Sequence, residues 1–246
     1  MKELMVGNWK MNQSGAEIKE FFDFFDAKFT GKRDAWIAPQ AMQFAFVQAR
    51  GKKHDVKVGL QNCSEHDKGA YTGENSAHYF ARHGGNFVII GHSERRQYFG
   101  ETSKMCALKI KRCFKEGLTA IYCVGETLPE RESNQTLAIV GDQLRQGLSD
   151  VTGATVENLI IAYEPVWAIG TGKTASPAQA QEVHAYIRTV LKERYPGLGE
   201  KLRILYGGSV KPDNVEELLS QKDIDGGLVG GASLKAKDFL ALCGDK

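Results

Sequence analysis

Short apolar runs recur along the chain, and each is closed by glycine, proline or a polar residue. There are eight of them, at residues 4–9, 35–39, 56–62, 87–92, 119–125, 159–164, 202–208 and 226–231. Runs of this length and composition indicate buried β-strands. The segments between them have helical spacing, as in 177–195, and in 16–29 one face carries Ile18, Phe21, Phe22, Phe25 and Phe29.

The alternation of strands and helices predicts the architecture. Repeated βα units imply parallel strands joined by right-handed crossovers. Eight units in 246 residues match the size of a closed (β/α)8 barrel, an α/β fold with eight parallel strands inside an outer ring of helices. No low-complexity linker interrupts the chain, so we expect one domain over residues 1–246. An open, doubly wound sheet is the alternative on pattern alone.

The charge balance argues against whole classes of partner. Lysine and arginine total 32 against 30 acidic residues, and the chain has no basic block. We therefore expect no nucleic-acid partner and no binding to a membrane surface. No apolar run approaches the roughly 20 residues that a membrane helix needs. A strand-like segment at 3–7 leaves no room for a signal peptide, which predicts a soluble, cytoplasmic protein.

The cysteines support the same compartment. They are odd in number and widely spaced, without a CxxC pair: Cys63, Cys106, Cys113, Cys123 and Cys243. This spacing favours reduced thiols in a cytosolic protein and gives no support for structural zinc.

Candidate catalytic residues are those at the ends of the expected strands, because barrel active sites lie at the C-terminal face. The polar and glycine residues at these ends are Asn8, Lys10, Gln61, Asn62, His92, Ser93, Glu94, Glu126, Glu164, Gly207–Ser209 and Gly230–Gly231. Among six histidines, only His92 falls at such an end. Lys10 is either a solvated lysine or a cation that points into the barrel mouth.

The three glutamates differ in their sequence neighbours. Glu94 and Glu126 lie near arginines, and we expect ion pairs between these glutamates and Arg95, Arg96 or Arg131. Glu164 has no basic neighbour before Lys173 in the sequence that follows it. A structural ion pair therefore explains Glu164 less well than it explains the other two, and Glu164 is the preferred catalytic carboxylate.

Two glycine runs suggest an anion site. Gly207–Gly208 and Gly230–Gly231 follow the last two strands, and Ser209 adds a hydroxyl donor. Phosphate sites in barrels are often built from these two loops, although glycines there could also serve only tight turns. A carboxylate, a histidine, a lysine and an anion site suit proton abstraction beside a carbonyl of a small phosphorylated substrate, without a metal.

The segment after Glu164 predicts a long loop. Pro165 ends the strand, and helix resumes only after Ser176, where Ser-Pro-Ala-Gln gives an N-cap, a first-position proline and a capping box. The GTGKT stretch at 170–174 is not a P-loop, since Trp167 stands where that motif needs glycine. It is also too far from its strand for a dinucleotide-binding turn. Loops of this length are commonly lids.

Six segments resemble the triosephosphate isomerase family, in the same order and over nearly the full chain. They are GNWKMN (7–12), VIIGHSERR (88–96), CVGET (123–127), AYEPVWAIGTGKTA (162–175), YGGSV (206–210) and GLVGGASL (227–234). The resemblance implies interconversion of dihydroxyacetone phosphate and D-glyceraldehyde 3-phosphate through an enediol or enediolate, without a cofactor.

The resemblance also implies roles for individual residues. Glu164 would be the base, His92 the electrophile at the carbonyl oxygen, Lys10 the nearby cation and Asn8 a substrate contact. The phosphate would be bound by Gly170, Ser209, Gly230 and Gly231, with Ser93 and Glu94 supporting the catalytic residues. The family is the standard example of a catalytic histidine kept neutral by a helix N-terminus, and residues 93–96 favour such a turn.

The third βα loop, at 63–85, carries a family-like GAYTGE followed by an unusual ENSAHYFARHG. In the family this loop inserts into a partner subunit, so the resemblance implies a homodimer in which Thr72 reaches the partner's active site.

Two alternative functions remain. One is a barrel aldolase with a Schiff-base lysine, for which Lys10 is the only lysine at a strand end. The other is a catalytically silent phosphate-binding barrel.

Overall fold

The computed structural model describes residues 1–169 and 174–245 of the chain. Within them, eight parallel strands form a closed barrel in sequence order, with the first strand paired to the last. The strands are β1 (Leu4–Asn8), β2 (Asp34–Ala38), β3 (Lys57–Leu60), β4 (Phe87–Ile90), β5 (Thr119–Val124), β6 (Leu159–Tyr163), β7 (Arg203–Tyr206) and β8 (Gly226–Val229). The predicted barrel is confirmed.

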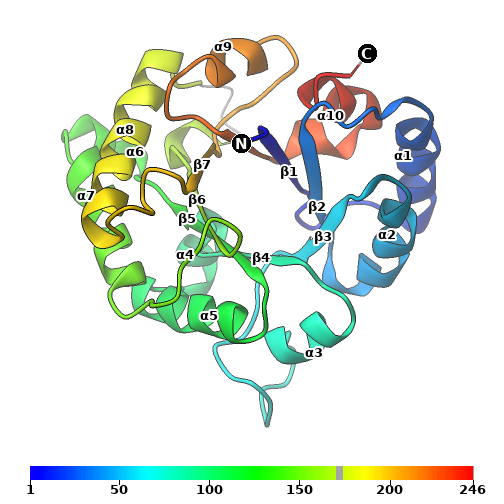
Figure 1. The fold of residues 1–246 in the computed structure, drawn as a ribbon, viewed down its shortest axis with the longest axis horizontal. Helices are drawn as coiled ribbons and strands as arrows, with labels where there is room; N and C mark the ends of the chain where they lie inside the picture. Colours follow the sequence, from blue (N-terminus) through cyan, green and yellow to red (C-terminus); the bar gives the residue numbers. More distant parts are fainter. Residues whose placement is uncertain (170–173, 246) are drawn as a thin grey trace.

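Helices surround the barrel (Figure 1). They are α1 (Gly15–Lys28), α2 (Phe44–Gly51), α3 (Ala77–Arg82), α4 (Ser93–Phe99), α5 (Ser103–Lys115), α6 (Leu128–Glu132), α7 (Thr136–Leu148), α8 (Pro177–Arg194), α9 (Val215–Leu219) and α10 (Ala236–Leu242). The two helices predicted from their apolar spacing form within one residue of the expected bounds. Short 3-10 turns occur at Ala41–Gln43, Lys52–His54, Val166–Ala168 and Gly231–Leu234.

The strands have side chains buried on both faces, which explains their continuous apolar runs. One set fills the barrel interior and includes Leu4, Phe87, Ile121 and Leu205. The alternate set packs against the helices and includes Met5, Val88, Tyr122 and Ile204. Because successive side chains on a strand point to opposite faces, two separate apolar layers result.

All eight strands end earlier than their apolar runs predict, which leaves the polar residues of the site on the loops that follow. β4 ends at Ile90, and Gly91 adopts a left-handed conformation with φ 72°. That conformation is readily available only to glycine. The turn redirects the chain so that His92 becomes the N-cap of α4.

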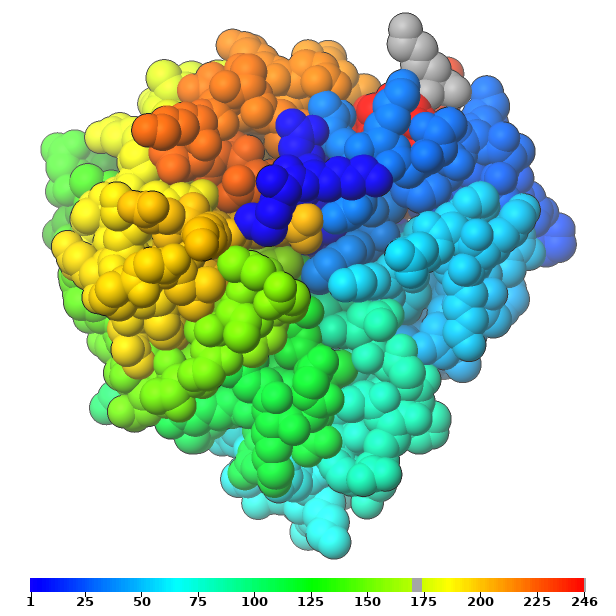
Figure 2. Space-filling view, viewed as in Figure 1, coloured from blue at the N-terminus to red at the C-terminus, as the bar shows by residue number. Residues whose placement is uncertain are grey.

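Figure 2, which has the same view as Figure 1, shows the N-terminal end of the barrel. The first residues of the chain, in dark blue, lie across its centre. The carboxyl ends of the strands, and the loops that follow them, therefore face away from this view. In the described part of the chain, no helix is long and apolar enough to cross a membrane.

Candidate functional site

A cavity of about 760 Å³ opens at the C-terminal end of the barrel. Loops after five strands, β1, β4, β6, β7 and β8, contribute to its wall. The sequence-predicted residues that line it are Asn8, Lys10, His92, Glu164, Gly207, Gly208, Ser209, Gly230 and Gly231. Residues that are far apart in the sequence therefore meet in one place, as the barrel interpretation requires.

Glu164 follows β6 directly and is almost fully buried, with 2% of its surface exposed. Its backbone N–H donates to Val124 O at 2.8 Å, which continues the pairing of β6 with β5. The carboxylate has two partners at the site. His92 Nε2 lies 2.9 Å from Oε1, and the backbone N–H of Ser93 donates to Oε2 at 2.9 Å.

The imidazole of His92 has a defined tautomer. As N-cap of α4, it accepts a hydrogen bond at Nδ1 from the backbone N–H of Glu94 at 3.2 Å. A ring nitrogen that accepts cannot carry a proton, so the proton of the neutral ring is assigned to Nε2. Nε2–H then donates to the Glu164 carboxylate, and the helix N-terminus holds the ring in this orientation.

The two groups shift each other's pKa values. Burial favours the neutral acid of Glu164, but the His92 contact and the Ser93 N–H outweigh it and lower the pKa of the carboxyl. Burial likewise disfavours the imidazolium of His92, but the facing Glu164 carboxylate opposes this and raises the pKa of the ring. The site therefore holds an ionised carboxylate in a place that excludes most water.

Lys10 is held in an unusual backbone conformation, with φ 51°. Its backbone N–H donates to Asn8 Oδ1 at 3.2 Å, and its carbonyl accepts from Gln61 Nε2 at 2.8 Å. The ammonium forms an ion pair of 2.6 Å with Glu94 Oε1. Non-glycine residues rarely adopt this region, and such strain persists where surrounding contacts impose it.

The expected pairing of Glu94 with a neighbouring arginine is wrong. Arg95 Nε instead binds Glu101 Oε2 at 2.6 Å, and Arg96 Nε donates to Gly91 O at 2.9 Å. On the short helix α4 the Glu94 side chain points towards the barrel mouth, where Lys10 is the available cation. Sequence proximity did not decide the pairing, because the fold brings together residues 84 positions apart.

The pairing predicted for Glu126 is confirmed, with Arg131 Nη1 at 3.5 Å from Oε1. This fully buried carboxylate also accepts hydrogen bonds from the Tyr163 hydroxyl at 3.1 Å and from Trp167 Nε1 at 2.9 Å. Trp167 lies in the 3-10 turn Val166–Ala168, at the start of the long loop after β6. Glu126 thus anchors one end of the predicted lid.

The glycine runs have two distinct environments. A Cβ at Gly231 would meet no atom within 4 Å, so its backbone is open to the cavity. A Cβ at Gly207 would lie 2.8 Å from Glu164 Cγ, so this glycine makes room for the carboxylate. No pattern along the chain predicts that packing role. Gly170, predicted to bind phosphate, lies outside the described residues.

Thr72 lies outside the cavity, on the exposed loop that follows β3 and projects from the molecule (Figure 1). Among the described residues, no group of three or more histidine, cysteine or carboxylate side chains could hold a metal ion.

The family model for triosephosphate isomerase matches residues 3–246. The chain belongs to the triosephosphate isomerase family. It is 49% identical over 242 residues to the triosephosphate isomerase of Trichlorobacter lovleyi, covering 97% of this chain and 96% of that protein. It is 48% identical over 243 residues to that of Endomicrobium trichonymphae, covering 98% and 97% of the two chains.

The fold agrees with a solved triosephosphate isomerase structure. The crystal structure of the enzyme from Bartonella henselae superposes with a TM-score of 0.90 at 42% identity, covering 99% of this chain and 98% of that one. In this triosephosphate isomerase family member, the sequence also does not predict that Gln61 supports Lys10 by a hydrogen bond to its carbonyl. The only sequence signal for this contact is that Gln61 follows the third strand.

Proposed function

We propose that this protein interconverts dihydroxyacetone phosphate and D-glyceraldehyde 3-phosphate, without a cofactor. The observation that carries the proposal is the convergence of Glu164, His92 and Lys10 in one cavity. A buried ionised carboxylate can take a proton from a carbon beside a carbonyl, and the imidazole and ammonium can stabilise the negative charge that develops on oxygen.

Glu164 would carry the proton between the two carbons. Its lowered pKa keeps the carboxylate ionised at neutral pH. Before it acts, the carboxylate must release the Ser93 N–H and His92 and turn towards the substrate. The substrate, rather than water, takes the place of these partners. The carboxylate then faces the substrate carbon in a site of low polarity, where a carboxylate is a stronger base.

His92 would polarise the carbonyl as a neutral donor. Its Nε2–H already points at an oxygen, that of Glu164, at 2.9 Å. When Glu164 turns away, the charge that raises the pKa of the ring also leaves. Burial and the Glu94 N–H at Nδ1 then favour the neutral ring, which can donate its Nε2 proton to the substrate oxygen.

The remaining residues would hold the substrate. The Lys10 ammonium can neutralise charge on the enediolate oxygen and on the phosphate, with Asn8 beside it. Ser209, Gly230 and Gly231 line the same cavity and offer donors to the phosphate. Gly170 would join them from the lid, and closing that lid would exclude water from the intermediate.

The aldolase alternative has less support. A lysine that forms a Schiff base must present a free amine, and of the described lysines that line this cavity Lys10 lies nearest to the end of its strand. Its nitrogen is engaged in an ion pair with Glu94 Oε1 at 2.6 Å and is not free to attack a carbonyl. The same pair suits a cation that stabilises an oxyanion.

The test is an assay that supplies D-glyceraldehyde 3-phosphate and follows dihydroxyacetone phosphate with a coupled reductase. In Glu164→Gln, which removes the base and keeps the size, we expect kcat to fall by at least about 100-fold with a modest change in KM. Glu157→Gln, an exposed carboxylate at the other end of the barrel, is the matched control. Full activity in Glu164→Gln, or no turnover by folded wild type, would refute the proposal.

We also propose that the protein is a cytoplasmic homodimer in which Thr72 reaches the partner's active site. Large exposed apolar side chains follow four neighbouring strands, β1 to β4, and so share one side of the barrel: Met11, Met42, Tyr71, Tyr98 and Phe99. Such a surface favours a protein interface. Sedimentation at micromolar concentration should give twice the 27.1 kDa chain mass, and a monomer there would contradict the dimer.

A further inference from the structure

Two thiols touch beneath the loop that follows β3. Cys63 comes three residues after the strand, and Cys113 lies in the last turn of α5. Their Sγ atoms are 4.0 Å apart, and both residues are fully buried. They are separated by 50 positions in the sequence, so the contact joins two different βα units.

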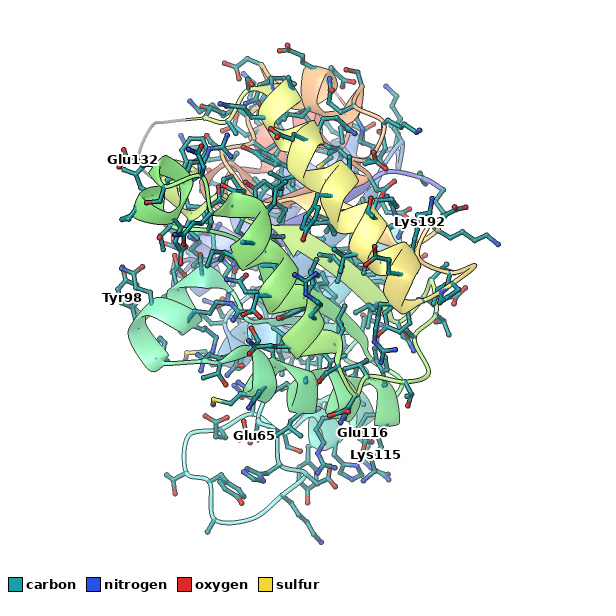
Figure 3. All side chains as sticks on the ribbon, turned by 90° about the vertical axis from the view of Figure 1, so that its left-hand side faces the viewer. Glu65, Tyr98, Lys115, Glu116, Glu132 and Lys192 are labelled. Carbon is teal, nitrogen blue, oxygen red and sulfur yellow. The ribbon has the colours of Figure 1, made fainter. Side chains whose placement is uncertain are left out.

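The loop above the two thiols is closed and tied to α5. The Ser64 N–H donates to Asn75 O at 2.8 Å and closes the base of the loop. Arg112 donates from Nε to Glu65 O at 2.8 Å and from Nη1 to Asp67 at 2.7 Å, and Lys115 Nζ reaches Asp67 at 2.9 Å. Figure 3 shows the loop projecting from the molecule beside Lys115.

We propose that Cys63 and Cys113 are a site of reversible oxidation. A small disulfide such as oxidised glutathione would oxidise the two thiols, which then form an intramolecular disulfide bond with each other. The thiolate of one cysteine attacks the reagent and releases one glutathione thiol. The second cysteine, after losing its proton, attacks the resulting mixed disulfide and releases another. The two protein thiols are oxidised, and one molecule of oxidised glutathione is reduced to two thiols.

The pairing is specific within the described part of the chain. The gap between the two sulfur atoms must shorten by about 2 Å to reach the length of a disulfide bond, which is within reach of side-chain rotation and a small backbone shift. Cys106, on the same face of α5, instead contacts Glu101 Oε1 at 3.5 Å. It is the matched control cysteine, since it is equally buried and its hydrogen bond goes to a carboxylate rather than to a thiol.

The loop would control the rate. The hydrogen bond with Cys63 and burial raise the pKa of the Cys113 thiol, so little thiolate forms while the loop is closed. In the proposed homodimer this loop also contacts the partner subunit, so solvent and reagent enter only when residues 64–75 open away from both α5 and the partner. The resulting disulfide ties the base of this loop to α5 and limits how far it can move.

The experiment incubates the full-length protein with oxidised glutathione and maps its peptides without reduction. We expect the loss of two thiols, one cross-linked peptide pair that contains Cys63 and Cys113, and reversal by dithiothreitol. Cys106→Ala should give the same cross-link, whereas Cys113→Ala should give none. Stable glutathione adducts on either cysteine, a different pairing, or no cross-link even in urea just below the unfolding transition would overturn the proposal.

The loop contacts provide a second, kinetic arm that leaves both cysteines in place. Arg112→Gln removes the two contacts to Glu65 and Asp67, and we expect the cross-link to form several-fold faster. Lys111→Gln changes an adjacent, partly exposed residue, whose contact is a 3.9 Å ion pair with Asp150, and should leave the rate unchanged. Equal rates in the two variants would show that the loop does not gate the site.

Discussion

At Gly207 the absence of a side chain makes room for the proposed base. A Cβ there would lie 2.8 Å from Glu164 Cγ and 3.1 Å from Tyr163 O. The carboxylate and the backbone of β6 would both have to move. A displacement of about 1 Å in a catalytic group can cost on the order of 100-fold in rate.

We therefore expect Gly207→Ala to lower kcat by roughly 100-fold while the protein still folds. The coupled isomerase assay gives kcat, and circular dichroism checks the fold. Gly15→Ala is the control, because a Cβ there meets nothing within 4 Å at the start of α1. It should keep full activity and gain slightly in stability. Wild-type kcat in Gly207→Ala would mean that Glu164 tolerates the shift.

The start of α8 shows a local signal that the sequence predicts fully. The expected capping box is present: the Gln179 N–H donates to Ser176 Oγ at 3.2 Å, and the Ser176 N–H donates to Gln179 Oε1 at 2.9 Å. Pro177 occupies the first helical position, where no N–H is needed. These contacts define where the long loop after β6 ends.

Ser176→Ala removes this cap from the 18-residue helix. We expect the free energy of unfolding to fall by about 1 kcal/mol, since one helix N–H loses its acceptor. Urea denaturation measures the change. Ser149→Ala is a suitable control, because the Ser149 hydroxyl donates to Gln146 O and caps no N–H. A loss of equal size in both variants would argue against a capping effect.

Prediction from sequence succeeded where a signal is long or local. The apolar patterns of the eight strands and of the helices α1 and α8 are clear enough to distinguish strand from helix. Short helices such as α3, with six residues, and α6, with five, offer too few positions for a period to be seen. The candidate cavity residues were found because strand ends mark the barrel mouth.

Contacts between side chains far apart in sequence could not be predicted in this way. The Glu94 pair with Lys10 depends on how α4 is oriented over the barrel, and no local pattern encodes that direction. The role of Gly207 depends likewise on the approach of Glu164 from the neighbouring strand. The sequence shows which residue types are present, but which of these side chains touch depends on how the closed sheet brings its strands together.

For the molecule as a whole, a buried histidine links stability to pH. His184 on α8 is fully buried, and burial lowers its pKa to about 4. In the neutral ring, Nδ1–H donates to Asp223 O at 3.0 Å. The unfolded chain binds this proton more readily, because the unperturbed pKa of histidine is about 6.5. Stability from this residue is therefore present above pH 6.5 and is lost as the pH falls towards 4.

Between about pH 6.5 and about pH 4 the free energy of unfolding falls by roughly 3 kcal/mol because of this histidine. Urea denaturation at pH 7 and pH 4.5 should show a smaller decrease in unfolding free energy for His184→Gln than for wild type. Glutamine can still donate to Asp223 O and does not titrate. His83→Gln, at an exposed histidine, should follow the wild-type curve. Parallel curves for all three proteins would exclude His184 as the cause.

The pairing of β1 with β8 also constrains how the molecule can be made. Leu4 lies beside Gly226, so the ring closes only after almost the entire chain has left the ribosome. Until then, the nascent β1 has one unpaired edge, and sheet edges recruit other strands. Late truncation, even far from the catalytic residues, would leave that edge open, so protein synthesis must be nearly complete before this fold can protect itself from aggregation.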